Sequence, residues 1–265
     1  MRRVLCAWAP VLSGLLLLTG CIKSRMLVVV KPDASGYVVL TQVTPSRAYG
    51  GRSQGAEAFA ATLDKAAERF GEGVKLAKSE RIGTQGFAAV FAFTNVNTLT
   101  VPLVAAGPLA DMTGGDMDGA PSFMRQSVQF ALSHTNGTRL DIQMPNALLE
   151  ALSQPVETNT TAEAEGASPD MEDIAGLQIE IAVEVRGRVL TTTASHADTN
   201  RPNRFVLFQL HGDALSRNPQ AMRALSAGPS DMNDADGFMA RFLRLAGATV
   251  ETNRQVAIRF QQEAP

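Results

Sequence analysis

Three histidines are the side chains of this sequence best suited to acid–base or metal chemistry near neutral pH. His196 and His211 flank an expected strand, and each has an aspartate two residues further along, Asp198 and Asp213. His134 ends another expected strand beside an Asn-Gly turn. A catalytic zinc site needs three such ligands converging around an open position. The simpler interpretation, which we favour, is that these are turn residues with hydrogen-bonding roles.

Other patterns that carry chemistry are weak or missing from the sequence. Asp111, Asp116 and Asp118 lie with several glycines in a loop over 107–121 and supply oxygen ligands of the kind that calcium prefers. That loop lacks the EF-hand spacing and its closing glutamate, so we favour a polar flexible loop. The sequence has no Gly-x-Ser-x-Gly motif, phosphate-binding loop or dinucleotide fingerprint. We therefore expect no catalytic, cofactor-binding or metal-ligating residue, and we expect that the chain is not an enzyme.

The clearest motif of the sequence ends at a cysteine. The chain has two cysteines, Cys6 and Cys21. Cys21 follows a short basic start, an apolar run over 4–18 and two small residues, which is the order of a secretory signal peptide. The apolar run of about 15 residues is shorter than the roughly 20 that a membrane-spanning helix requires.

The sequence Leu18-Thr19-Gly20-Cys21 resembles the bacterial lipobox. In that motif the cysteine thiol takes a diacylglyceryl group, and cleavage before the cysteine leaves an N-terminus that is acylated, for example with palmitate. We predict a lipoprotein signal peptide over 1–20 and lipidation of Cys21. The alternatives are an ordinary secretory signal with a chance cysteine, or an uncleaved N-terminal anchor.

Lipidation of Cys21 would place the protein in the bacterial cell envelope, facing the periplasm or the exterior. Ile22, rather than aspartate, follows the cysteine and favours the outer membrane in a cell that has one. The mature chain would keep no free thiol and no disulfide. Loss of Arg2 and Arg3 takes the net charge from −2 to about −4, and the sequence has no basic run. Nucleic acid is therefore not an expected partner.

The rest of the sequence reads as strands joined by tight turns. Apolar, β-branched or alternating segments predict about nine or ten strands, mostly in hairpins. The strongest turn signal is Asn136-Gly137, which lies between two alternating segments. Helical spacing of apolar residues predicts helices over 53–70, 214–225 and 230–245, of which the segment over 214–225 is interrupted by Pro219. The expected fold class is α+β, with antiparallel β-sheet hairpins and about three packed helices.

An acidic segment over 151–175 is the best internal boundary. It is rich in threonine, alanine and glutamate and has the composition of a disordered linker. We predict an N-terminal α+β part over 21–150 and a C-terminal α+β part over 176–265, with one continuous domain as the alternative. The first hairpin, over 26–43, starts so soon after Cys21 that we expect the body to sit close to the membrane.

Several of these segments together resemble a family of uncharacterised bacterial lipoproteins, over nearly the whole mature chain. The part over 185–210 is also similar, more faintly, to mycobacterial LppM-type lipoprotein domains. The motifs are strand and turn motifs, so the resemblance implies fold and location and no catalytic residue. The segments are Cys21-Ile22-Lys23, Lys31-Pro32-Asp33-Ala34-Ser35-Gly36, Gly73-Val74-Lys75-Leu76, Phe91-Ala92-Phe93-Thr94, Ile181-Ala182-Val183-Glu184-Val185, Thr193-Ala194-Ser195-His196 and Val250-Glu251.

These observations favour a membrane-anchored envelope lipoprotein whose body is a non-catalytic binding or scaffolding module. The expected partners are the membrane, through the lipid on Cys21, and an envelope protein, polysaccharide or lipid. Two alternatives stay open. One is a metal-dependent hydrolase-type enzyme that uses His196, His211 and the nearby aspartates, and the other is a carrier of an apolar ligand between sheet and helices.

Overall fold

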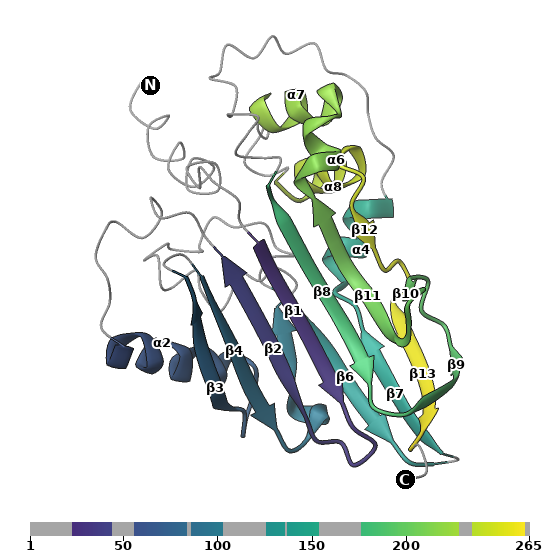
Figure 1. Ribbon diagram of the computed structural model, residues 1–265. Coiled ribbons are helices and arrows are strands. Elements are labelled where there is room, and N and C mark those ends of the chain that lie inside the picture. The colour runs from purple at the N-terminus through teal and green to yellow at the C-terminus, as the bar shows by residue number, and fades with distance from the viewer. Residues whose placement is uncertain are drawn as a thin grey trace, which may run out of the picture.

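The computed structural model describes residues 23–43, 56–83, 86–102, 126–135, 137–153, 176–227 and 235–262. These residues form two β-sheets packed face to face, with helices beside and at one end of them (Figure 1). The first sheet has eight strands, and the second has five. In spatial order the first sheet contains β10 (Ala197–Asp198), β11 (Arg201–His211), β8 (Gln178–Val185), β1 (Lys23–Val30), β2 (Gly36–Val43), β4 (Gly86–Phe93) and β3 (Lys75–Ile82), and β12 (Thr249–Val250) also pairs with β11.

The second sheet lies behind the first in Figure 1 and is smaller. Its strands, in spatial order, are β5 (Thr100–Pro102), β6 (Ser127–Ser133), β7 (Thr138–Gln143), β13 (Gln255–Gln261) and β9 (Arg188–Thr192). The hairpin predicted around Asn136-Gly137 is confirmed, since β6 pairs antiparallel with β7. Gly137 has a φ of 97°, a conformation that glycine adopts without steric cost.

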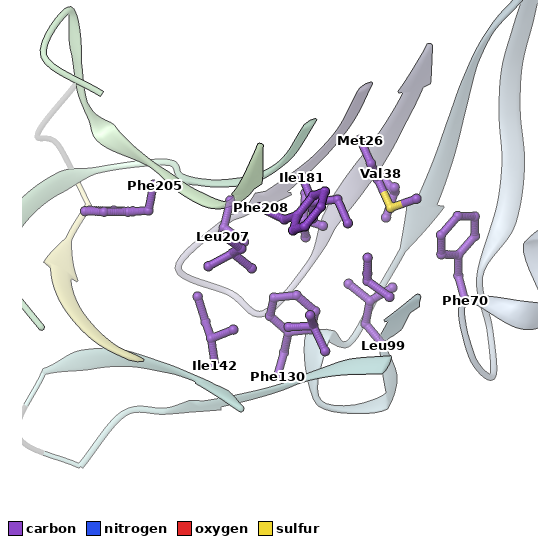
Figure 2. Packing of buried hydrophobic residues seen from close by; sticks show 14 of the residues in the cluster. Met26, Val38, Phe70, Leu99, Phe130, Ile142, Ile181, Phe205, Leu207 and Phe208 are labelled. Atoms are coloured by element: carbon purple, nitrogen blue, oxygen red, sulfur yellow. The ribbon is translucent and has the colours of Figure 1, made fainter. Parts of the chain in front are cut away.

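The core lies between the two sheets and follows from strand alternation. Met26, Val28 and Val30 of β1 point inward and are fully buried, because successive side chains of a strand point to opposite faces. Figure 2 shows Ile181 and Phe208 of the first sheet above Phe130 and Ile142 of the second. All four residues belong to one continuous hydrophobic cluster.

Helices extend the same core. Among the described residues there are five α-helices, so the prediction of about three is wrong. Part of the difference has a local cause, because the segment over 214–225, expected to be interrupted by Pro219, forms two separate helices. Asn218 accepts hydrogen bonds from the backbone of Gln220 and Ala221 and so starts a new helix at Pro219, a position where proline is well tolerated. The helices are α2 (Ala56–Arg69), α4 (Asn146–Ser153), α6 (Gly212–Ser216), α7 (Pro219–Ala227) and α8 (Ala235–Leu245), with a 3-10 turn η1 (Val96–Thr98).

The α+β class is confirmed in its coarse form, as a mostly β structure with several helices, but one strand pair is not antiparallel. β1 pairs antiparallel with β2 and parallel with β8, so that Met26 lies opposite both Leu40 and Ile181. A parallel pair needs a long crossover connection, and most of the first half of the chain lies between these two strands.

Strands from before and after the predicted linker over 151–175 lie in both sheets. β1 pairs with β8 in the first sheet, and β7 pairs with β13 in the second. Most of the linker itself, 154–175, lies outside the described residues. The division into parts over 21–150 and 176–265 therefore stays a prediction.

The chain crosses from the first sheet to the second at Gly187, between β8 and β9. Its φ is 152°, and a Cβ at this position would lie 2.3 Å from the carbonyl oxygen of Gln261 on β13. Gly187 therefore combines a backbone conformation that favours glycine with a close approach that only glycine permits. The chain therefore passes close to β13 where it enters the second sheet.

We predict that Gly187→Ala lowers the free energy of unfolding by about 2 to 4 kcal/mol, because it adds backbone strain and a steric clash. The matched control is Gly137→Ala, which also has a positive φ but has no heavy atom within 4 Å of the added Cβ. Its expected cost is about 1 kcal/mol. Urea-induced unfolding measures both, and equal losses for the two variants would contradict the assigned contact.

Candidate functional site

The outer face of the first sheet, on the side away from the core, carries a row of apolar side chains. Val90, Val39, Leu27, Ala182 and Val206 are register neighbours on β4, β2, β1, β8 and β11 in turn. We call these five residues the apolar row. None of them belongs to the hydrophobic cluster between the sheets, although Ala182 is itself buried. The row is therefore a second apolar surface of the same sheet.

Helices α2, α6, α7 and α8 do not supply a cover for this row. Most of their buried residues join the hydrophobic cluster between the sheets, and Phe70, just after α2, packs against Phe91 with ring centroids 5.0 Å apart. Val90, Val39 and Leu27 are half-buried. Within the described residues, no helix is long and apolar enough to cross a membrane.

The outer face of the second sheet is different in composition. Three successive rows across β6, β7 and β13 are polar or small and are mostly exposed. Polar outward residues are the usual pattern for a sheet with one solvated face. These rows are Gln129, Gln143 and Gln255, then Ala131, Asp141 and Ala257, then Ser133, Arg139 and Arg259.

Arg139 is fixed on that polar face by Asp141. Its Nε and Nη2 atoms donate to the Asp141 carboxylate at 2.7 to 3.0 Å. This hydrogen bonding, with the charge of Asp141, raises the pKa of the Arg139 guanidinium above its ordinary value. Arg259 lies directly opposite Arg139, so the face keeps a surplus cation.

An ion-pair cluster borders the apolar row on the side toward the start of β1. The Glu180 carboxylate accepts hydrogen bonds from Arg204 Nη2 and, at 3.3 Å, from Gln209 Nε2. Arg25 Nε lies 3.7 Å from the same carboxylate. The Glu180 and Arg204 side chains are only 10% and 13% exposed, so this pair is largely removed from water. Arg204 Nε is also buried and has no hydrogen-bond partner.

The reach of Arg204 explains why part of the row is covered. Arg204 lies opposite Glu184 in the strand register, yet its guanidinium contacts Glu180, four residues away along β8. Its side chain must therefore run along the sheet past Ala182, which is fully buried. Long arginine stems commonly cover apolar surface in this way.

A second ion-pair cluster borders the apolar row on the opposite side, toward the end of β1. Arg186 Nη2 donates to the hydroxyl oxygen of Tyr37 at 2.8 Å, and Arg186 Nη1 lies 3.4 Å from Glu184. The hydrogen bond to Tyr37 and the charge of Glu184 raise the pKa of the Arg186 guanidinium above its ordinary value. Val29 lies between Tyr37 and Glu184 in the register, and its exposure is only 1%.

An open hollow of about 430 Å³ adjoins the Glu180 cluster. Its lining is mainly polar and comes from β1, β8, β10, β11 and β12. The hollow offers hydrogen-bond donors and acceptors to a small polar group, but its two arginines are already engaged with Glu180. Its lining residues include Arg25, Glu180, His196, Asp198, Thr199 and Arg204.

The fully buried carboxylate of Glu251 fixes one wall of this hollow. It accepts hydrogen bonds from Ser195 N at 2.7 Å, Ser195 Oγ at 3.0 Å and Asn253 N at 2.9 Å. These bonds satisfy a buried charge and tie the loop before β10 to the segment after β12. His196 follows Ser195, and its Nε2 lies 3.2 Å from the Val250 carbonyl oxygen. Since a carbonyl can only accept, His196 Nε2 is the donor.

The three histidines lie at separate places. The backbone of Val206 donates to His196 O, which places His196 beside a residue five positions before His211 on β11. Five strand residues span roughly 16 Å, too far for His196 and His211 to share a metal ion. His134 lines another open hollow of about 450 Å³ with Asp33 and Arg259. Within the described residues, no group of three or more His, Cys, Asp or Glu side chains is placed to hold a metal.

Two sequence predictions lie outside the described residues. Cys21, the predicted lipidation site, falls in the segment before residue 23. Asp111, Asp116 and Asp118 of the acidic loop fall in the segment over 103–125.

Comparison with known proteins adds a distant structural similarity. No family model matches the chain, and no curated protein matches it. The chain is similar to the folded domain of LppM from Mycobacterium tuberculosis, solved by NMR, with 12% identity over 74% of this chain and 85% of that domain. The TM-score is 0.29. LppM-type domains were the fainter of the two expected resemblances, and a likeness at this level establishes neither a shared fold nor a shared function.

The sequence predictions missed the residues that organise this face. Glu180 and Glu184 were expected to be the polar side of a half-buried strand, whereas both are 8% exposed and paired with arginines. The available signal was their two-residue alternation with small Ala182; the basic partner Arg204 lies on β11, which follows β8 in the sheet but not directly in the sequence. Glu251 had no signal, because its partner Ser195 lies 56 residues away.

We predict that Glu180→Leu lowers the free energy of unfolding by about 3 kcal/mol, because it leaves the Arg204 charge largely buried without its carboxylate. Arg204→Met has a similar expected cost, and the double variant should lose clearly less than the sum of the two. A double-mutant cycle in urea measures this coupling. The control pair is Lys78 and Glu80, whose side chains are 73% and 68% exposed and whose coupling should be close to zero. An equally small coupling for Glu180 and Arg204 would contradict the cluster.

Proposed function

We propose that this chain is a bacterial envelope lipoprotein, anchored by lipid on Cys21 and facing the periplasm or the exterior. The outer membrane is the proposed location in a cell that has one. The body is proposed to be a binding or scaffolding module that has no catalytic activity. The observation that carries this proposal is the position of β1, which begins at Lys23, two residues after the proposed lipidated cysteine.

The short connection constrains the body strongly. Two extended residues span at most about 7 Å, so a lipid on Cys21 would hold the start of β1 at the bilayer surface. β1 is an interior strand that pairs along its whole length with both β2 and β8. It therefore cannot detach to lengthen the tether without breaking the eight-stranded sheet. A second or third acyl chain would make the attachment firm, because each buried CH₂ contributes about 0.8 kcal/mol.

The arrangement of polar groups supports binding in preference to catalysis. Buried or nearly buried carboxylates are engaged in structural contacts, Glu180 with Arg204, Glu184 with Arg186 and Glu251 with the Ser195 loop. Among the described residues, the apolar row is instead a partly exposed feature, since four of its five members are half-buried and only Ala182 is fully buried. A partly exposed apolar surface with a polar rim is a candidate interaction site. The proposed partner is another component of the envelope, namely a protein, a polysaccharide or lipid.

We predict that metabolic labelling with a palmitate analogue marks the protein and that Cys21→Ser abolishes the label, because the thiol is the proposed site of lipid transfer. The control is Cys6→Ser, which removes the other cysteine of the chain from within the proposed signal peptide and should leave the label intact. Gel fluorescence after attaching a dye to the analogue measures both. Labelling that survives Cys21→Ser would refute the proposal.

A further inference from the structure

The two outer faces of the sandwich differ in a way that solvation alone does not explain. On the second sheet, the central outward row is Ala131, Asp141 and Ala257, and the flanking rows are polar. On the first sheet, the central outward row is apolar across five strands. A sheet with two apolar faces is normally covered on both.

The rim of the apolar row has a surplus of positive charge. Three acidic residues of the face lie beside a cation: Glu180 with Arg204, Glu184 with Arg186, and Glu80 with Lys78 at 3.6 Å. The further cations are the exposed Lys23 and Arg25 of β1 and the exposed Lys75 of β3, of which Arg25 also lies 3.7 Å from Glu180. These three cations outnumber the one further acid of the adjoining hollow, Asp198. Lys78 continues the apolar row itself, because it lies opposite Val90.

The strand that begins two residues after the proposed anchor contributes to this face. Lys23, Arg25 and Leu27 alternate with the inward residues of β1 and therefore point outward from the sheet. Leu27, at the centre of the row, lies only about 13 Å along the strand from Lys23. A lipid on Cys21 would thus keep the apolar row within a short distance of the bilayer.

We propose that the outer face of the first sheet lies on the surface of the bilayer that holds the anchor. The apolar row would meet the boundary between headgroups and acyl chains, and Lys23, Arg25, Lys75 and Lys78 would meet anionic lipid headgroups. Apolar centres flanked by basic residues are the composition of interfacial membrane-binding surfaces. This inference rests on the proposed function, because it needs the lipid on Cys21.

The size of the patch favours a bilayer over a second copy of the chain. Five strands and three outward rows cover roughly 500 Å², at strand spacings of about 4.8 Å and row spacings of about 6.7 Å. A stable protein interface needs about 800 Å² on each partner. A tethered face needs a much smaller contact area, because a short tether holds it at a high effective concentration next to its target.

The absence of other thiols in the proposed mature chain allows a direct test. We would introduce Val39→Cys on the apolar row and, as a matched control, Ala257→Cys in the central row of the other outer face, each in the full lipidated protein. Each would carry an environment-sensitive fluorophore, in phosphatidylcholine vesicles with nitroxide-labelled lipids, with and without phosphatidylglycerol. Vesicle flotation would first establish that the protein is anchored.

We expect the fluorophore at Val39 to lose most of its emission to the nitroxide lipids, and the fluorophore at Ala257 to keep it. Phosphatidylglycerol should increase the loss at Val39. Lys75→Gln combined with Lys78→Gln should remove that increase, whereas Arg259→Gln on the opposite face should not. Val90→Cys provides a second site on the row if the label at Val39 disturbs folding.

The outcomes distinguish a failure of the proposed function from a failure of this inference. Protein that does not float with the vesicles would refute the lipid anchor and hence the proposed function. Protein that floats but shows equal quenching at Val39 and Ala257 would overturn this inference alone. Quenching that gives way to protection at Val39 as the protein density on the vesicles rises would identify a second copy as the occupant and would also overturn it.

Discussion

The parallel pairing of β1 with β8 is the interaction on which the rest of the structure depends. It joins the start of the described chain to a strand more than 150 residues later and places β1 in the interior of the eight-stranded sheet. The register sets Leu27 beside Ala182 on the outer face and Met26 beside Ile181 in the core. A shift of one residue would exchange these two faces along the whole strand. The core and the apolar row are therefore specified together.

This pairing also determines which surfaces the body can offer. The edges of the first sheet give little opportunity for strand addition. β3, at one edge, carries Lys75, Lys78 and Glu80, and β10, at the other, is only two residues long. In the second sheet, the edge strand β5 has three residues and includes Pro102, which cannot donate to a neighbouring strand. Short and charged edges oppose edge-to-edge association at these three strands. β9, the remaining edge, has five residues and begins with Arg188.

Local patterns predicted the parts of the fold that local contacts determine. Alternation and turn residues located the hairpins at 26–43 and around Asn136-Gly137, because their partners are adjacent in sequence. The same patterns could not pair β1 with β8, since no short window contains both strands. The interruption expected at Pro219 is a local feature as well, and the Asn218 side chain begins a second helix there.

The candidate site, like the fold, was predictable from the sequence only where it depends on local patterns. The outward alternation of Glu180 and Glu184 was visible in the sequence, but their burial depends on Arg204 and Arg186 and on the long-range neighbour β1. The apolar row is assembled from five strands and has no sequence signature of its own. The histidines were the residues of the sequence best suited to acid–base or metal chemistry. They lie apart in the structure because each belongs to a different turn or strand end.

The most direct test of the central claim, that one interior strand joins the anchor to a membrane-facing sheet, is neutron reflectometry of the lipidated protein on a supported bilayer. With β1 tethered at Cys21 and the first sheet lying on the surface, protein density is expected to begin among the headgroups without an intervening water layer. A hydrated gap between the headgroups and the protein would contradict that claim.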